Sequence, residues 1–344
     1  MRVLIVSDAW WPQVNGVVVT LVHTVAGLER LGHDVHLVTP EGFRTLPAPS
    51  YPEIALALKP GREVARRIED FDPDAVHLAT EGPLGIAARR HCLRSGRPFT
   101  TAWHTQFPEY LHARWRIPLG VSYAWLRRFH APSQAVLCGT PAVRDHLADR
   151  GFSRVEVWCK GVDAGLFRPA ARQPRAGERP IFLYVGRLAV EKGVEEFCGL
   201  DLPGTKWIVG DGPSRGALER EHPRIRFFGM LRGEALAHAY QQADVFVFPS
   251  RTDTFGLVLL EAMACGTPVA AHPVRGPLDV VTDRDAGVLD EDLAAAALAA
   301  LKLDRDRVRR FAERFPWQAA TRQFVAHLNP RPRQRVLLPV LDND

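Results

Sequence analysis

The segment Phe248-Pro-Ser-Arg-Thr-Asp253-Thr-Phe-Gly256-Leu-Val-Leu-Leu-Glu261-Ala-Met-Ala-Cys-Gly-Thr-Pro268 decides the fold. An apolar strand ends at Pro249, a short polar loop follows, and a helix is predicted to begin at Gly256. Free backbone N–H groups at the start of such a helix form an anion site. Glu261 lies among apolar neighbours further along the helix, so its carboxylate needs hydrogen-bond donors. Ribose hydroxyls or a nearby arginine would supply them.

Strands and helices alternate along almost the whole chain. Apolar runs predict strands in the first half at Val3–Ser7, Val35–Thr39, Ala75–Leu78, Phe99–Trp103, Ala135–Cys138 and Val155–Trp158. A second series is predicted at Ile181–Val185, Trp207–Val209, Ile225–Phe228, Val245–Phe248 and Val269–Ala271. Strands that alternate with helices imply parallel sheets joined by right-handed crossovers. The predicted fold class is therefore α/β, with two doubly wound sheets.

The polar, proline-rich segment 169–179 separates the two series and predicts a linker. We therefore place one Rossmann-like domain at residues 1–168 and a second at 180–315. A last helix is predicted over 316–328, and the Pro- and Arg-rich tail 329–344 is expected to be disordered or weakly docked. Two such domains would form a cleft between the carboxyl ends of their sheets, where ligands of these folds bind.

The composition is that of an ordinary globular chain. Of 344 residues, 46% are hydrophobic and 24% are charged, which excludes disordered, collagen-like and membrane-spanning classes. The net charge of +5 is too small to make nucleic acid the expected partner, although it suits an anionic surface or substrate. Five scattered cysteines without a Cys-x-x-Cys pair, and no signal peptide, indicate a reduced, cytoplasmic protein without a metal site.

Two cations follow another strand of the second series, in Gly186-Arg187-Leu-Ala-Val-Glu-Lys192-Gly193. Both lie past the carboxyl end of the strand, on the loop that enters the next helix. There they suit a diphosphate leaving group, and each would contribute about 4 kcal/mol at about 4 Å with an effective dielectric near 20. The alternative, that both are solvated loop charges, stays open at this point.

Loops at the ends of other strands carry further candidates. His104 ends a strand of the first series and would point into the cleft, where it would bond a sugar hydroxyl; a structural histidine is the alternative. Gly16 opens the first helix and permits close approach to an anion, although the dinucleotide fingerprint is missing there. A spaced-glycine run at Gly210–Gly216 lacks the acidic residue that would complete a dinucleotide site.

Taken together, three segments resemble glycosyltransferase family 4, whose members have the GT-B fold. The matching segments are Val185-Gly-Arg-Leu…Glu-Lys-Gly193, Val209-Gly-Asp-Gly-Pro213 and Phe255-Gly-Leu…Glu-Ala-Met-Ala-Cys-Gly-Thr-Pro-Val269. The likeness extends over most of residues 1–328. It implies an N-terminal acceptor-binding domain, a C-terminal domain that binds the nucleotide sugar, and a final helix that crosses back to the first domain.

The resemblance also implies roles for individual residues. Arg187 and Lys192 would hold the nucleotide diphosphate, Glu261 the ribose, and His104 the donor sugar. The family usually has a Glu-x7-Glu pair, and this chain has Asp253 at its first position, which leaves the donor sugar open. Further contacts to the nucleotide sugar would come from Gly16, Gly186, Gly210, Met230, Asp253, Thr254, Phe255, Gly256 and Leu257. Enzymes of this family retain the anomeric configuration and generally need no metal or other cofactor.

The segment Tyr110–Ala131 combines aromatic side chains with arginines and contains no acidic residue. Trp115 and Trp125 lie near Arg116 and Arg127, a pattern that suits a helix in an anionic membrane interface. A core helix with solvated arginines is the alternative. We expect peripheral association with the inner face of the cell membrane.

Looser motifs at Leu56–Pro60, His77–Gly82 and Lys160–Asp163 resemble sulfoquinovosyl and glucosyl diacylglycerol synthases, which move a hexose from a UDP-sugar to diacylglycerol. The sequence therefore predicts a UDP-hexose-dependent transferase with a lipid acceptor such as diacylglycerol. The chain is also similar to bacterial GDP-mannose-dependent α-mannosyltransferases, and the alternative hypothesis is such an enzyme acting on a glycan or carrier-linked acceptor. A nicotinamide-dependent oxidoreductase is a distant third hypothesis.

Overall fold

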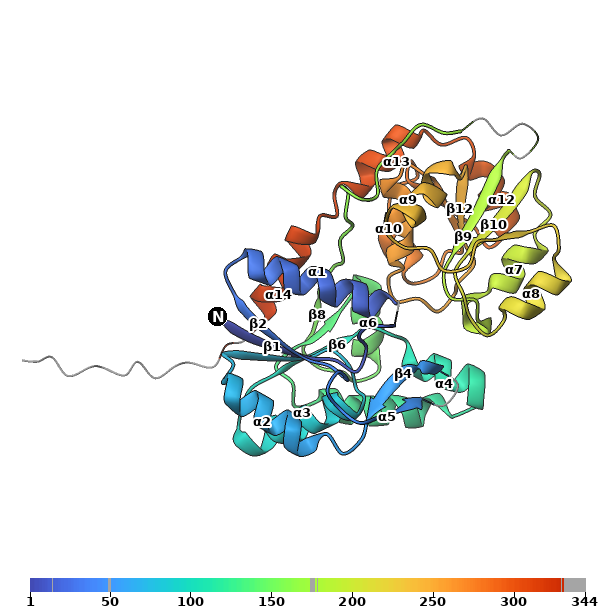
Figure 1. Ribbon diagram of the computed structural model, residues 1–344. Coiled ribbons are helices and arrows are strands. Elements are labelled where there is room, and N and C mark those ends of the chain that lie inside the picture. The colour runs from blue at the N-terminus through green and yellow to red at the C-terminus, as the bar shows by residue number, and fades with distance from the viewer. Residues whose placement is uncertain (14, 49–50, 174–176, 178, 329, 331–344) are drawn as a thin grey trace, which may run out of the picture.

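The computed structural model describes residues 1–344 except 14, 49–50, 174–176, 178, 329 and 331–344 (Figure 1). The described chain forms two α/β domains, each built on a parallel sheet. Residues 174–176 and 178 of the predicted linker, and all of the predicted tail except Pro330, lie outside the described residues. The predicted α/β class with two Rossmann-like halves is confirmed.

The N-terminal sheet has the strand order β2-β1-β5-β6-β7-β8. Its strands are β1 (Arg2–Val6), β2 (Asp34–Val38), β5 (Ala75–Leu78), β6 (Thr100–Trp103), β7 (Val136–Cys138) and β8 (Val155–Val157). All described pairings in this sheet are parallel. A separate antiparallel hairpin of β3 (Thr45–Ala48) and β4 (Tyr51–Ala57) was not predicted, because a proline interrupts the pattern of each strand.

Helices cover both faces of this sheet because alternate residues of its strands are apolar on opposite sides. Val3 and Ile5 belong to one core cluster and Leu4 and Val6 to another. The described helices of this half are α1 (Gly16–Arg30), α2 (Gly61–Phe71), α3 (Pro83–Ser95), α4 (Phe107–Trp115), α5 (Leu119–His130) and α6 (Pro141–Asp149).

The C-terminal sheet has the order β11-β10-β9-β12-β13-β14, which reverses direction between β9 and β12. Its strands are β9 (Ile181–Val185), β10 (Thr205–Val209), β11 (Arg226–Phe227), β12 (Val245–Phe248), β13 (Val269–Ala271) and β14 (Gly287–Leu289). This is the strand order of a dinucleotide-binding Rossmann sheet, and its ligands bind where the order reverses. The strand β14 was not among those predicted.

The helices that complete the C-terminal half include a short 3-10 turn before α7. They are η1 (Val190–Lys192), α7 (Val194–Gly199), α8 (Arg215–Glu221), α9 (Gly233–Gln242), α10 (Leu257–Ala264), α11 (Pro277–Val280), α12 (Leu293–Ala300), α13 (Arg305–Ala312) and α14 (Trp317–His327). None of the helices in the described part of the chain is long and apolar enough to cross a bilayer.

The last helix returns to the N-terminal domain. Pro316, which cannot continue a helix, separates α13 from α14. The helix α14 then packs against α1, and the Trp158 indole donates a hydrogen bond to the Ala320 carbonyl (3.1 Å) (Figure 1). The crossover implied by the resemblance is therefore present. It ties the two domains together at a second place besides the linker.

Candidate functional site

The candidate site lies at the carboxyl ends of β9 and β12, the neighbouring strands at which the C-terminal sheet reverses its order. The loop after β9 carries Arg187 and Lys192, and the loop after β12 carries Asp253. Neighbouring parallel strands end at the same edge of a sheet, so the topology brings these two loops together. The N-terminal domain contacts the same loops, because Thr254 Oγ1 donates a hydrogen bond to the His104 carbonyl (2.8 Å).

Lys192 and Asp253 form an ion pair inside this site. The Lys192 ammonium lies 2.6 Å from Asp253 Oδ1, and both side chains are about four-fifths buried. Burial alone would lower the pKa of Lys192, but the Asp253 carboxylate raises it above its usual value. Lys192 also bonds the Tyr110 hydroxyl of α4 (3.4 Å). The ammonium therefore stays charged at neutral pH and lies at the boundary between the domains.

The start of α10 offers backbone donors beside this pair. Gly256 precedes the helix with φ +83°, a left-handed conformation, and an added Cβ would lie 3.0 Å from Leu259 Cδ1. No described side chain caps the helix, and Leu259 donates to the Gly256 carbonyl (3.0 Å), so the N–H groups of Leu257 and Val258 are the ones left for an anion. Phe255 is buried and lies against Gly139 at the end of β7. The ring of Phe255 therefore packs between the domains, and only its backbone is placed to meet a ligand.

Glu261 lies on α10, and its carboxylate accepts a hydrogen bond from the Tyr240 hydroxyl of α9 (3.0 Å). Burial raises the pKa of Glu261 to about 7, and the bond from Tyr240 opposes this rise. A buried carboxylate with a single described donor has acceptor capacity left for further hydroxyl groups. Two vicinal hydroxyls of a ribose would supply them, and a buried ion pair, the alternative weighed from the sequence, is not formed among the described contacts.

The glycine-containing loops form one packed layer at the sheet edge. Gly186 donates to the Val209 carbonyl (3.0 Å), and Gly210 donates to the Gly229 carbonyl (2.8 Å). An added Cβ on Gly210, whose φ is +138°, would lie only 1.9 Å from the Gly186 oxygen. Met230 follows Gly229 and is 45% exposed. These glycines therefore let adjacent loops pack closely.

Arg187 follows β9, and the Tyr184 hydroxyl donates a hydrogen bond to its carbonyl oxygen (2.8 Å). This bond fixes the backbone from which the guanidinium extends. The loop is further held because Leu188 donates to the Asp211 carbonyl (2.9 Å). Arg187 thus projects from a rigid segment at the same sheet edge as Lys192.

His104 follows β6 at the carboxyl edge of the N-terminal sheet. Its ring lies edge-on to Trp158, with 5.7 Å between ring centroids. Its Nε2 atom is buried and has no hydrogen-bond partner among the described residues. Burial, with the charge of Lys160 and the nearby His77, lowers the pKa of His104 well below its ordinary value. The imidazole is therefore neutral, with one nitrogen left to bond a ligand.

Gly16 begins α1 and faces the start of α10. An added Cβ at Gly16 would lie 3.7 Å from Leu257 Cδ1, so the two helix starts approach each other across the domain boundary. The Asn15 side chain already accepts hydrogen bonds from Val17 and Val18 (3.0 Å each). The anion-binding capacity expected at Gly16 is therefore confined to the N–H groups that Asn15 leaves free.

Three residues near the site were missed from the sequence: Asn15, Tyr110 and Tyr240. Asn15 carried a signal, since an asparagine directly before an apolar periodic segment is a typical helix cap. Tyr110 lies within the segment predicted to face a membrane, but its hydroxyl bonds Lys192 instead. Tyr240 is 21 residues from Glu261, and only packing of α9 on α10 brings them together.

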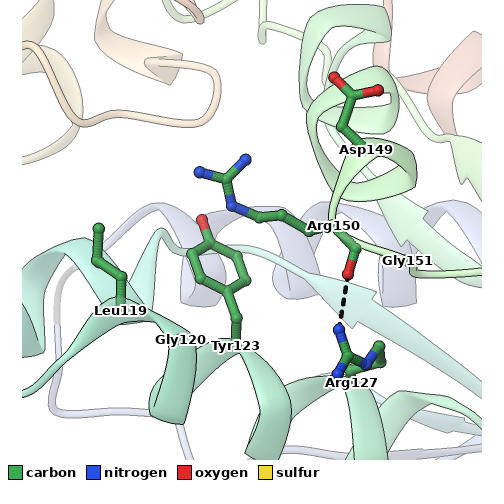
Figure 2. Close-up of a pocket in the computed structure, with 7 residues that line it drawn as sticks. All are labelled: Leu119, Gly120, Tyr123, Arg127, Asp149, Arg150 and Gly151. Carbon is green, nitrogen blue, oxygen red and sulfur yellow. Dashed lines mark hydrogen bonds between the residues drawn. The ribbon is translucent and has the colours of Figure 1, made fainter.

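Two cavities open on the described part of the N-terminal domain. Figure 2 shows one of about 520 Å³ between the start of α5 and the end of α6. Tyr123, Arg127 and Arg150 line it, and Arg127 donates to the Arg150 carbonyl (3.0 Å). The other, of about 460 Å³, lies between the starts of α2 and α3. Neither cavity contains a residue predicted to bind the nucleotide sugar.

Among the residues that the structure describes, no three histidine, cysteine or acidic side chains are grouped closely enough to hold a metal ion.

Comparison with known proteins identifies the family of the chain. The family model Glycosyltransferase Family 4 matches residues 14–166, and the model Glycosyl transferases group 1 matches residues 179–306. A GDP-mannose-dependent alpha-mannosyltransferase of Mycobacterium tuberculosis is 34% identical over 316 residues, which cover 84% of this chain and 83% of that relative. The chain belongs to glycosyltransferase family 4.

Another relative and a solved structure extend the comparison. An alpha-monoglucosyldiacylglycerol synthase of Streptococcus pneumoniae is 28% identical, and the match covers 88% of this chain and 78% of that relative. The Anabaena protein HepE, solved with UDP and glucose, has a TM-score of 0.68 at 16% identity, with 95% of this chain and 98% of that chain covered. The fold is therefore GT-B, as the resemblance implied.

Proposed function

We propose that this glycosyltransferase moves a hexose from a nucleotide sugar to a lipid acceptor at a membrane surface, with retention of the anomeric configuration. The observation that carries the proposal is the convergence of Lys192, Asp253, the uncapped start of α10 and Glu261 at the point where the C-terminal sheet reverses. His104 meets these loops from the opposite domain.

The proposed chemistry is electrostatic. Negative charge develops on the departing diphosphate, and Arg187, Lys192 and the free N–H groups of α10 neutralise it. Lys192 exchanges its bond with Asp253 for a phosphate oxygen, which frees Asp253 to accept hydrogen bonds from the hexose. A diphosphate oxygen deprotonates the incoming hydroxyl on the same face of the sugar, so no side chain acts as a nucleophile.

The remaining contacts position the donor. Glu261 accepts hydrogen bonds from the ribose hydroxyls, and the neutral His104 bonds a hydroxyl of the hexose. The backbone at Gly16, Gly186 and Gly210 lets the phosphates approach closely, and Met230 contacts the base. Because these side chains and N–H groups supply the positive charge, we propose that transfer requires no metal ion.

GDP-mannose is the donor that we favour. A relative whose printed name specifies GDP-mannose is 34% identical to this chain, against 28% for the monoglucosyldiacylglycerol synthase. Asp253 is one methylene shorter than the usual glutamate, which alters the reach toward the sugar. A UDP-hexose, the donor predicted from the sequence, is the second candidate and is supported by the lipid-synthase relative.

The membrane contact is proposed for the outer side of α4 and α5. Trp115, Val121 and Trp125 are each about half exposed or more, whereas Leu126 and Phe129 are buried in the core. Arg127 and Arg128 are exposed on α5 between these residues. Such a helix lies in an anionic interface with its aromatic rings at the headgroup level. We propose that the protein works on the cytoplasmic surface of the membrane.

A donor panel tests the proposal. Purified protein is mixed with GDP-mannose, UDP-glucose, UDP-galactose or UDP-glucuronate and with lipid vesicles, and hexose transfer to lipid is measured. We expect transfer from GDP-mannose with release of GDP. Transfer only to soluble glycans, with no flotation on anionic vesicles, would contradict the membrane role. No transfer from any of the four donors would contradict the proposed activity.

A further inference from the structure

Tyr110 brings a hydroxyl group of the N-terminal domain to the proposed diphosphate site. It lies on α4, and its oxygen is 3.4 Å from the Lys192 ammonium of the C-terminal domain. Burial raises the pKa of the Tyr110 phenol, so the group stays protonated at neutral pH and its oxygen accepts from the ammonium. A lysine ammonium has three N–H donors. Among the described residues, its hydrogen-bond partners are this oxygen and Asp253 Oδ1 (2.6 Å), which leaves a donor for a phosphate oxygen.

The same side chain also meets the second loop of the site, which follows β12. The hydroxyl groups of Tyr110 and Thr252 are in hydrogen-bond contact. Thr252 Oγ1 donates to the carbonyl of Glu191, one residue before the lysine (3.0 Å). Two residues further along the loop, Thr254 Oγ1 donates to the His104 carbonyl (2.8 Å). The segment 104–110 of the N-terminal domain therefore contacts both loops of the diphosphate site.

Three tyrosine hydroxyls bond residues that are predicted to hold the nucleotide sugar. The Tyr184 hydroxyl donates to the Arg187 carbonyl (2.8 Å), and the Tyr240 hydroxyl donates to the Glu261 carboxylate (3.0 Å). Both tyrosines belong to the C-terminal domain itself, so their bonds do not depend on contact between the domains. The bond of Tyr110 crosses the domain boundary. The lysine therefore has both of its oxygen partners only while the two domains are in contact.

The helix α4 is fixed on its own domain beside this contact. The Tyr123 hydroxyl of α5 donates to the Glu109 carboxylate (2.6 Å). Phe107 and Trp115 of α4 are about half exposed on its outer side. Glu109 and Tyr110 are neighbours in the chain, so one ties α4 to α5 and the other ties it to the C-terminal domain. A hydroxyl held in this way costs little reorganisation at the moment of reaction.

We propose that Tyr110 is a positioning residue, whose hydroxyl holds the Lys192 ammonium within reach of the diphosphate once Asp253 gives up its bond to the lysine. The inference rests on the proposed function and adds a residue of the N-terminal domain that acts on the leaving group. Without the hydroxyl, the ammonium keeps Asp253 as its one described partner and is drawn toward that carboxylate. It then neutralises less of the charge that develops on the departing diphosphate.

The variant Tyr110→Phe tests this role, because it removes the hydroxyl and keeps the ring. Transfer from GDP-mannose and from UDP-glucose to a short-chain diacylglycerol is measured, together with hydrolysis of each donor without acceptor. We expect kcat to fall about tenfold, the effect of one hydrogen bond to a charged group. Hydrolysis should fall by the same factor, because both reactions share the leaving group. The KM for the acceptor should stay unchanged, whereas a disturbed α4 would raise it.

A double-mutant cycle assigns the effect to the lysine. Lys192→Ala and Tyr110→Phe/Lys192→Ala should have the same kcat within twofold, since the hydroxyl then has no ammonium to hold. Tyr123→Phe is the matched control, because its described bonds go to Glu109 and His146 rather than to the donor loops. Its effect should add to that of Lys192→Ala. A thermal melt of each variant shows that it is folded.

The possible outcomes are distinct. A kcat of Tyr110→Phe within twofold of the original protein would overturn the inference while the proposed function stands. Loss of transfer with unchanged donor hydrolysis would also overturn it, since the hydroxyl would then act on the acceptor. No transfer from any donor would overturn the proposed function, and the cycle is then measured on the Kd of GDP by calorimetry. Tyr110→Phe should weaken GDP binding in the original protein but not in Lys192→Ala, and equal weakening in both would overturn the inference.

Discussion

Replacement of Lys192 by alanine is the perturbation that bears most directly on the diphosphate site. An ammonium about 4 Å from a phosphate oxygen contributes about 4 kcal/mol at an effective dielectric near 20. Because the charge of the diphosphate grows as the sugar departs, most of this contribution belongs to the transition state. Water that fills the space left by the lysine side chain solvates the phosphate and restores part of this stabilisation. We therefore expect kcat to fall at least a hundredfold, or about 2.7 kcal/mol in the activation free energy.

The ion pair with Asp253 complicates this variant. In the structure, Lys192 Nζ lies 2.6 Å from Asp253 Oδ1. Without Lys192, the Asp253 carboxylate would therefore lie beside the diphosphate with no cation between the two negative groups. The double variant Lys192→Ala/Asp253→Asn removes this repulsion. If repulsion accounts for part of the loss, the double variant will be more active than Lys192→Ala and still far below the original protein.

Initial rates of hexose transfer, with a thermal melt of each variant, measure the effect. Lys302, an exposed lysine just after α12, provides the matched control, and the rate of Lys302→Ala should be within twofold of that of the original protein. Arg187→Ala should behave like Lys192→Ala. Turnover of a folded Lys192→Ala variant within fivefold of the original protein would refute the assignment of this residue to the diphosphate.

Three further predictions concern α10 and its partners. Because burial raises the pKa of Glu261 to about 7, its proton stabilises the folded state at low pH, and this stability is lost as pH rises from about 4.5 through 7. In chemical denaturation, the free energy of unfolding of Glu261→Gln should fall less over this pH range than that of the original protein. An identical pH dependence of the two proteins would contradict the prediction. Tyr240→Phe removes a hydrogen bond to the Glu261 carboxylate and so raises the pKa of Glu261 further. Calorimetry should therefore show that the variant needs a higher pH than the original protein to reach its full nucleotide affinity. Gly256→Ala forces a side chain into a left-handed conformation at φ +83° and should cost about 1–2 kcal/mol in a denaturation curve, whereas Gly216→Ala in α8 should not destabilise the protein.

The sequence sufficed for every strand of the two large sheets except β14. Strands such as β7 and β12 are short, wholly apolar runs, and the alternation of such strands with helices along the chain implies parallel sheets. Lys192 was selected because it follows the carboxyl end of β9, where parallel topology gathers the loops, whereas Asp253 was selected only through the family resemblance. The β3–β4 hairpin was missed because each of its strands includes a proline, Pro47 and Pro52, which weakens a strand pattern.

Contacts between distant segments could not be derived from local patterns. The bond from Lys192 to Tyr110 joins residues 82 positions apart, and Tyr110 had been assigned to a membrane-facing surface. The segment Tyr110–Ala131 folds as two helices, so that some of its aromatic residues point inward and others outward. Periodicity identifies an amphipathic segment, but it does not specify what its inner face contacts.

The stereochemistry of the product tests the central claim most directly. The purified protein is supplied with GDP-mannose, whose mannose is α-linked, and with a short-chain diacylglycerol, and the new glycosidic bond is examined by nuclear magnetic resonance. Transfer driven by charge on the departing diphosphate, without a side-chain nucleophile, predicts an α-linked mannosyl product and stoichiometric GDP. A β-linked product, or release of GDP with free mannose as the only sugar product in the presence of acceptor, would contradict the account.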